Sequence, residues 1–106
     1  MNDQRSITSE RYCVDFDQGR HHRAKIGYVL LATEQTIQDD VMKLRPEGVG
    51  IHLSRAPNPD SITNETFAKQ VEFLADAAST LLPDGSLDVI CYACTSGSLV
   101  IGEERV

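Results

Sequence analysis

The sequence predicts an α/β fold, with a parallel sheet built in β-α-β-α-β order. Three short apolar runs alternate with two segments of helical periodicity, over residues 26–32, 37–44, 49–53, 67–82 and 87–92. Strands that alternate with helical segments favour right-handed crossovers and a parallel sheet. The carboxyl ends of all three strands should therefore line one edge of that sheet.

The first strand and the first helix follow one another directly. Residues 26–32 (IGYVLLA) form an apolar run that ends at the polar residues 33–36 (TEQT), as expected for a buried strand. Residues 45–48 (RPEG) contain the breakers that end the helix. Between these segments, apolar residues fall at i, i+4 and i+7: Ile37, Val41 and Leu44.

The second strand, residues 49–53, precedes the clearest helix of the chain. Ser54 and Arg55 follow this strand, and residues 57–60 (PNPD) form a loop. Thr63 or Asn64 is positioned to cap the helix. Its apolar face has helical spacing: Phe67, Val71, Leu74, Ala78, Leu81 and Leu82. Its opposite face is expected to be polar: Lys69, Gln70, Glu72 and Asp76.

The third strand, residues 87–92, is short and follows the turn signal Pro83–Ser86, so we expect it to be buried. Cys91 would then be a structural cysteine inside the strand, and Cys94 would lie just past its carboxyl end. The polar residues expected at the carboxyl edge of the sheet are Thr33, Glu34, Ser54, Arg55, Cys94, Thr95 and Ser96.

Composition indicates one globular domain and excludes several classes of function. The chain has 106 residues, a net charge of −6 and only ten Lys and Arg, too few for a general nucleic-acid surface. No apolar stretch approaches the ~20 residues that span a bilayer, and the N-terminus has no signal-peptide core, so a cytoplasmic location is expected. Three cysteines, an odd number, favour free thiols over a disulfide framework.

We expect two regions along the chain. Residues 1–24 are polar and form an extension that packs on a neighbour. Residues 25–106 form an α/β lobe that is incomplete, because a third helix begins at Leu99 and reaches Val106 without a cap or breaker. Two helices also leave a parallel sheet poorly covered. The chain is therefore expected to be a fragment, or to pair with a second copy or a missing lobe.

Cys94 is the candidate nucleophile, because ligands of open α/β sheets bind outside the carboxyl ends of the strands. A helix that begins after Cys94 would favour its thiolate form and direct backbone N–H groups toward an anion. Thr95 and Ser96 supply further donors, and Arg55 on the same edge could pair with a carboxylate, although an ordinary ion pair is slightly favoured for it. A small carboxylate is the expected ligand.

The spacing Cys91-Tyr92-Ala93-Cys94 also matches C-x-x-C, the pattern of redox and zinc sites. In thioredoxin-like motifs the first cysteine opens a helix, whereas Cys91 is expected inside a strand and buried. The other candidate zinc ligands, Cys13 and three histidines, show no recognisable spacing. Both alternatives are disfavoured, and neither a metal nor a cofactor is expected.

Two segments, residues 25–33 (KIGYVLLAT) and 91–98 (CYACTSGS), resemble the aspartate/glutamate racemase superfamily, in the branch of maleate isomerase and arylmalonate decarboxylase. Together with Gly48-Val49-Gly50, they are most similar to the ectoine-utilisation protein of that superfamily. The likeness covers residues 24–106 and implies part of one lobe of a two-lobed fold. It implies that Cys94 is the first catalytic cysteine and that Thr95 and Ser96 bind a substrate carboxylate, with Thr33 and Glu34 beside them.

Two departures from the family pattern bear on the substrate. Neither Cys13 nor Cys91 lies where the second lobe would place its thiol, and Glu34 stands where maleate isomerases usually carry an asparagine. The resemblance predicts the N-terminal part of a cofactor-independent racemase, isomerase or decarboxylase of small carboxylates or dicarboxylates, with a role in ectoine catabolism. The alternative is a carboxylate-binding or scaffold fragment without catalysis.

Overall fold

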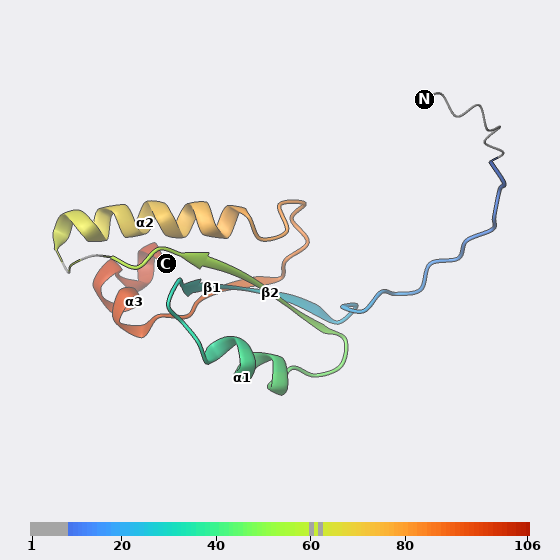
Figure 1. Ribbon diagram of the computed structural model, residues 1–106, viewed down its shortest axis with the longest axis horizontal. Helices are drawn as coiled ribbons and strands as arrows, with labels where there is room; N and C mark the ends of the chain where they lie inside the picture. Colours follow the sequence, from blue (N-terminus) through green and yellow to red (C-terminus); the bar gives the residue numbers. More distant parts are fainter. Residues whose placement is uncertain (1–8, 60, 62) are drawn as a thin grey trace, which may run out of the picture.

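The chain forms a three-stranded parallel sheet with helices on both sides (Figure 1). This computed structural model describes residues 9–59, 61 and 63–106. Its elements follow the predicted β-α-β-α-β order. The strands are β1 (Ala24–Leu31), β2 (Val49–Ala56) and β3 (Val89–Tyr92). The helices are α1 (Ile37–Leu44), α2 (Asn64–Ser79) and α3 (Thr95–Ile101), followed by a 3-10 turn, Glu103–Arg105.

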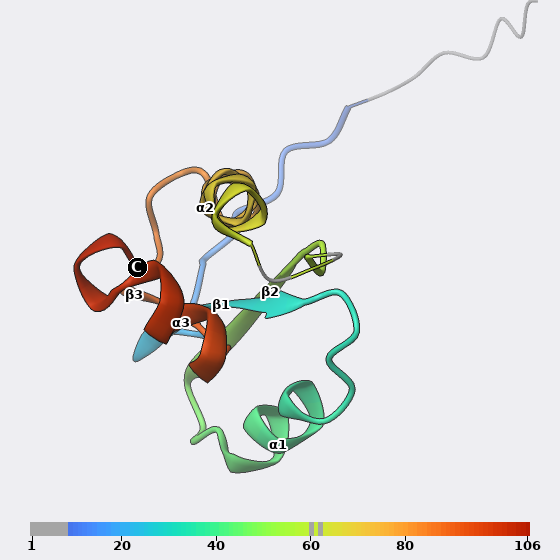
Figure 2. The same cartoon turned by 90° about the vertical axis from the view of Figure 1, so that its left-hand side faces the viewer.

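The strand order β2-β1-β3 places β1 in the centre. The chain leaves β1 for β2 through α1 and then crosses back past β1 through α2 to reach β3. Right-handed crossovers in opposite directions put the two helices on opposite faces of the sheet, as Figures 1 and 2 show. The carboxyl ends of β1 and β3 therefore meet at the point where the direction of winding changes.

The hydrophobic core lies between α2 and the face of β1 and β2 toward it. Val29 of β1, Ala56 of β2 and Ala77 of α2 are buried together with Leu81, just beyond the helix. Gly27 is tightly enclosed on the same face, since a Cβ there would lie 3.0 Å from Leu87 Cδ1. Side chains alternate along a strand, so Leu30, which is fully buried, points to the face that carries α1.

Helix α2 begins as expected and ends earlier than its apolar spacing suggests. Thr63 is its N-cap, and the Thr63 and Thr66 side chains each accept a hydrogen bond from the other's backbone N–H. At the other end, the Thr80 hydroxyl donates to Ala77 O over 2.7 Å and the Ser79 hydroxyl to Asp76 O over 2.6 Å. Side chains that bond to carbonyls of the last turn compete with a further helical turn.

Several expected elements and faces differ in the structure. The third helix begins at Thr95, not at Leu99, and ends at Ile101, because Gly102 takes a positive φ of 95° and acts as its C-cap. The expected continuous helix to Val106 is therefore wrong. Gln70, expected on the polar face of α2, is buried. The side chain of Phe67, expected on the apolar face, lies outside the described residues.

Strand β3 is not buried as expected. Val89 and Ile90 are 53% and 47% exposed, and Cys91 is exposed as well. The reason is topological: β3 is an edge strand that pairs only with β1, while α1 packs on β2 at the opposite edge. Cys91 is therefore an accessible thiol and not a structural core residue.

Residues 9–19 contain neither helix nor strand and run away from the sheet (Figure 1). Tyr12, Val14 and Phe16 are strongly exposed along this segment. Regular structure begins at Ala24, where the Arg23 N–H already donates to Gly48 O over 2.9 Å.

Candidate functional site at the carboxyl edge of the sheet

The site lies where β1 and β3 end side by side. Crevices at such a change of winding direction are the usual ligand sites of open α/β sheets. Backbone hydrogen bonding continues past the strand ends, with Ala93 N donating to Val29 O over 3.1 Å. This bond holds the turn that carries Cys94 against the central strand, with α3 beyond it (Figure 2).

Cys94 is the N-cap of α3. Its backbone is extended, and its Sγ accepts a hydrogen bond from Gly97 N over 3.4 Å, while Ser96 Oγ lies 3.7 Å from the same sulfur. A cysteine at this position does what Ser, Thr or Asp does at other helix starts, and it satisfies an N–H that has no partner inside the helix. An N–H that points at sulfur favours negative charge there.

Two hollows meet at Cys94. The smaller, of about 90 Å³, is lined by side chains from all three strand ends and from α2 and α3: Leu31, Pro59, Gln70, Tyr92, Cys94, Ser96, Gly97 and Val100. The larger, of about 500 Å³, lies toward α1: Ile37, Cys91, Tyr92, Ala93, Cys94, Thr95, Ser98 and Leu99. Thr95 and Ser96, expected to act together, thus line different hollows.

Cys91 lines the larger hollow beside Cys94, and both are free thiols. Alternation along β3 places Cys91 on the face of α1, a helix that packs on β2 and leaves this thiol exposed. The burial of Cys91 was one ground for disfavouring a redox role of the C-x-x-C spacing, and that ground is wrong.

Tyr92, the last residue of β3, lies over the first turn of α3. A Cβ at Gly97 would overlap the Tyr92 hydroxyl, so glycine is what allows this contact. Burial first, and then the neighbouring Cys94 thiol, raise the pKa of Tyr92 to about 12. The phenol keeps its proton at neutral pH, and its hydroxyl and the Cys94 sulfur both lie against Gly97.

Gln70 is the most unusual side chain of the site. It is only 2% exposed, and neither its Nε2 nor its Oε1 makes a hydrogen bond within the described part of the chain. The amide is close enough to the Tyr92 hydroxyl to oppose slightly the rise in its pKa. No contact between the two side chains has hydrogen-bond geometry, so the amide is unpaired within the described part of the chain. Buried amides without partners are rare in folded proteins.

Arg55 holds the loop after β1. Its Nη1 donates to Leu31 O over 3.0 Å and to Glu34 O over 2.8 Å, and its Nη2 to Gln38 Oε1 over 3.4 Å. A guanidinium carries five donors in a planar fork, which suits several carbonyls at once. The donors of Arg55 are therefore engaged with the β1–α1 loop, and its role in this arrangement is to hold that loop in place.

Glu34 caps α1 instead of facing either hollow. One carboxylate oxygen accepts from Thr36 N over 2.6 Å, from Ile37 N over 2.8 Å and from Thr36 Oγ1 over 3.0 Å. These bonds, the one from Ile37 first, hold the pKa of the Glu34 carboxyl below its ordinary value. Thr33 is also engaged: it donates its N–H to Asn58 Oδ1 over 3.2 Å and accepts from Asn58 Nδ2 over 2.9 Å.

The sequence analysis thus predicted the edge of the sheet at which the hollows lie, but only some of the residues that line them. Cys94, Thr95 and Ser96 line the hollows. The other three support the loops at this edge: Thr33 bonds to Asn58, Glu34 caps α1 and Arg55 binds the β1–α1 loop. It missed Gln70, Tyr92 and Pro59. A signal existed for Gln70, which falls at i, i+4, i+7 and i+11 with three residues of the apolar face: Leu74, Ala77 and Leu81.

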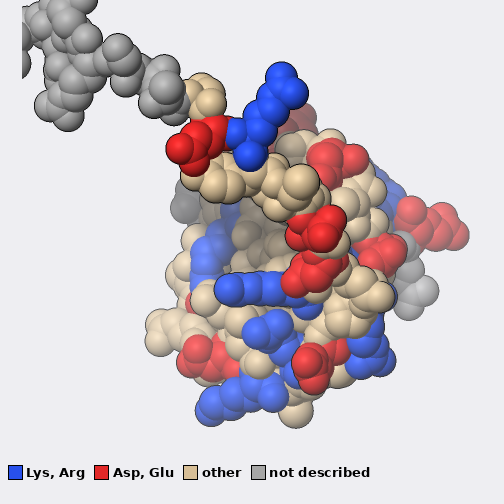
Figure 3. All heavy atoms as spheres, turned by 90° about the vertical axis from the view of Figure 1, so that its right-hand side faces the viewer, with Lys and Arg blue, Asp and Glu red and all other residues tan. Residues whose placement is uncertain are grey.

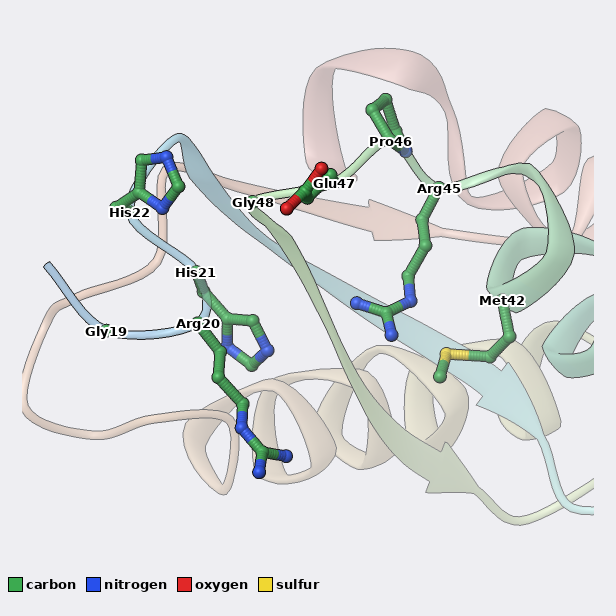
Figure 4. A pocket seen from close by; sticks show the side chains of 9 residues that line it. All are labelled: Gly19, Arg20, His21, His22, Met42, Arg45, Pro46, Glu47 and Gly48. Carbon is green, nitrogen blue, oxygen red and sulfur yellow. The ribbon is translucent and has the colours of Figure 1, made fainter.

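A separate hollow of about 540 Å³ lies at the opposite, amino end of the sheet. Figure 4 shows that its walls come from the segment before β1 and from the connection between α1 and β2, including Arg20 and Arg45. Figure 3 shows Lys and Arg side chains at this end with Asp and Glu among them.

A pair of histidines lies at the same end of the sheet. His21 packs on Gly50 and meets His52 edge to face, with ring centroids 5.4 Å apart. Burial, then the charges of His21 and Lys25, lowers the pKa of His52.

Two further properties concern metals and membranes. Over residues 9–59, 61 and 63–106, no group of three or more His, Cys, Asp or Glu side chains is arranged to hold a metal ion. Among the helices of these same residues, none is long and apolar enough to cross a bilayer.

No family model matches the chain, and no curated protein matches it. The resemblance to the aspartate/glutamate racemase superfamily therefore stays a prediction.

Proposed function

We propose that Cys94 is the reactive thiol of a cofactor-independent, cytoplasmic enzyme that acts on a small carboxylate. The observation that carries the proposal is the position of its sulfur at the junction of two hollows, where Gly97 N donates to it over 3.4 Å. The Tyr92 hydroxyl and Ser96 Oγ are further groups that stabilise a thiolate there.

Three reactions suit such a thiol. As a base or acid it removes or returns the proton next to a carboxylate, which is racemisation. As a nucleophile it adds to an alkene, so that the former double bond can rotate before the thiolate leaves. As an acid it protonates the enediolate that decarboxylation produces. Each needs donors at the carboxylate oxygens, and Thr95, Ser98 and free backbone N–H groups of the first turn of α3 are at hand beside the larger hollow.

The proposal includes membership in the aspartate/glutamate racemase superfamily and a role in ectoine catabolism, as the resemblance implies. It also includes a second lobe, or a second copy of the chain, that closes the larger hollow. The exposed Leu99 and Val100 of α3 support this part, since each lines one of the two hollows with an apolar side chain.

The test combines thiol labelling with turnover. The rate of Cys94 modification by N-ethylmaleimide is measured by peptide mass spectrometry with and without maleate, succinate and phenylmalonate, with exposed Cys13 as the reference thiol. The same acids and aspartate are then incubated in D2O and followed by proton NMR. We expect Cys94 to react faster than Cys13, to be protected by at least one acid, and to lose all turnover in Cys94→Ala. A rate equal to that of Cys13 with no protection would exclude the enzyme.

A carboxylate-binding or scaffold fragment remains the second candidate, and one observation favours it. Arg55, the cation predicted to bind a carboxylate at this edge, is engaged with the β1–α1 loop and so supplies no charge there to stabilise a reaction intermediate. Protection of Cys94 by an acid, without turnover of any, would support this candidate.

A further inference from the structure

We propose that the smaller hollow beside Cys94 binds the carboxamide group of a small ligand, and that the side-chain amide of Gln70 recognises this group. The inference deepens the proposed function and rests on it for the role of Cys94, since it assigns to the substrate a neutral amide end in addition to its carboxylate. Monoamides of short dicarboxylic acids are the class of ligand that it predicts.

The unpaired amide of Gln70 carries the inference. Its Nε2 and Oε1 are both buried and make no hydrogen bond among the described residues, and the side chain lines the hollow opposite Cys94. A buried amide without partners costs stability, so a ligand that supplies them recovers a large free energy. Gln70 needs an acceptor for Nε2 and a donor for Oε1 side by side, and a primary carboxamide offers this pair.

The size of the hollow agrees with a group of this kind. Its volume of about 90 Å³ is several times the ~10–15 Å³ that a single water requires, so it can hold a small polar group. A carboxamide has three heavy atoms, and the carbon that bears it would lie toward the thiol. Leu31, Pro59 and Val100 supply apolar walls for that carbon.

The lining also selects against a charged group. None of the described residues that line this hollow is Lys, Arg, His, Asp or Glu. A carboxylate placed there would lose its water without gaining a counter-charge, which is far more costly than burial of a neutral amide. The carboxylate of the ligand would instead lie in the larger hollow, near Thr95 and Ser98.

Two alkylating reagents test this distinction directly. Iodoacetamide and iodoacetate differ only in the group that Gln70 would recognise. With either reagent the Cys94 thiolate attacks the methylene carbon, an S–C bond forms as the C–I bond breaks, iodide leaves with the bonding electrons, and the thiol proton goes to solvent. The ratio of the two rates at Cys94, divided by the same ratio at Cys13, measures the preference for the amide.

We expect this normalised ratio to be about tenfold in favour of iodoacetamide, as one or two net hydrogen bonds would produce. In Gln70→Met, which keeps an unbranched side chain, it should fall to about one. The matched control Gln18→Met changes the same chemistry at an exposed position far from the site and should keep the wild-type ratio. The melting temperature of Gln70→Met should not fall.

Three results would overturn the inference: a normalised ratio near one in the wild type, an unchanged ratio in Gln70→Met, or a lower melting temperature of that variant. The last result would mean that the amide has a structural partner such as bound water. Protection of Cys94 by succinate together with any of these leaves the proposed function standing. If no carboxylic acid protects Cys94 from modification but the tenfold preference for iodoacetamide is observed, the result contradicts the proposed function and not this inference.

Discussion

Replacing Gln70 by methionine should stabilise the protein, although it removes a polar group at the candidate site. Gln70 is 2% exposed and both amide atoms lack partners within the described residues. A buried polar group without a hydrogen bond costs about 1–3 kcal/mol. Methionine has a similar unbranched shape and a flexible thioether that fills irregular space. The free energy of unfolding should therefore rise by about 1–3 kcal/mol.

The assay is thermal and chemical unfolding of the two proteins side by side. For a domain of this size, 1 kcal/mol corresponds to about 4–8 °C in melting temperature, so we expect an increase of about 4 °C or more. Gln18→Met, at an exposed position, should stay within about 0.5 kcal/mol of the wild type. A decrease for Gln70→Met would refute the reasoning, because it would show that the amide is already satisfied in the folded protein.

Other substitutions test the remaining contacts. Glu34→Gln should lose stability above pH 4.5, the ordinary pKa of the carboxyl, and the difference from wild type should vanish as the pH falls through the lower native pKa; pH-dependent melting measures both. Arg55→Lys should lower stability by about 1 kcal/mol in denaturant titrations, since an ammonium group cannot span the same carbonyls. Gly27→Ala should cost about 1–3 kcal/mol in the same assay, because its methyl group would meet two leucine methyl groups at 3.0 and 3.1 Å. Tyr92→Phe should slow Cys94 alkylation several-fold at neutral pH without loss of folding, because the polar hydroxyl beside the thiolate is lost; an unchanged rate would show that this hydroxyl does not stabilise the thiolate.

The element order follows from local sequence alone. Runs such as residues 26–32 and 49–53 are too short and too apolar for surface helices, and the spacing of Ile37, Val41 and Leu44 fits one helix face. Periodicity of this kind reports on a few neighbouring residues, which is why the β-α-β-α-β order, the parallel sheet and the position of Cys94 after β3 are predicted correctly.

The hydrogen-bond partners of polar side chains were harder to predict, because they depend on which loops lie next to each other in the fold. Arg55 and Glu34 are polar residues at the predicted edge, and nothing in their types distinguishes a substrate ligand from a support of the edge. Only the fold brings the Arg55 guanidinium to the carbonyls of the loop after β1 and turns the Glu34 carboxylate toward the first turn of α1.

Burial was decided by the tertiary structure. The sequence by itself predicted a strand within residues 87–92 and a helix over residues 67–82, because backbone preference and apolar spacing are local properties; the structure has these elements as Val89–Tyr92 and Asn64–Ser79. The order β2-β1-β3 then placed β3 at an edge, so Cys91 became accessible, while packing of α2 over β1 enclosed Gln70. Whether a side chain loses its water depends on segments far away in the sequence, and no local pattern contains that information.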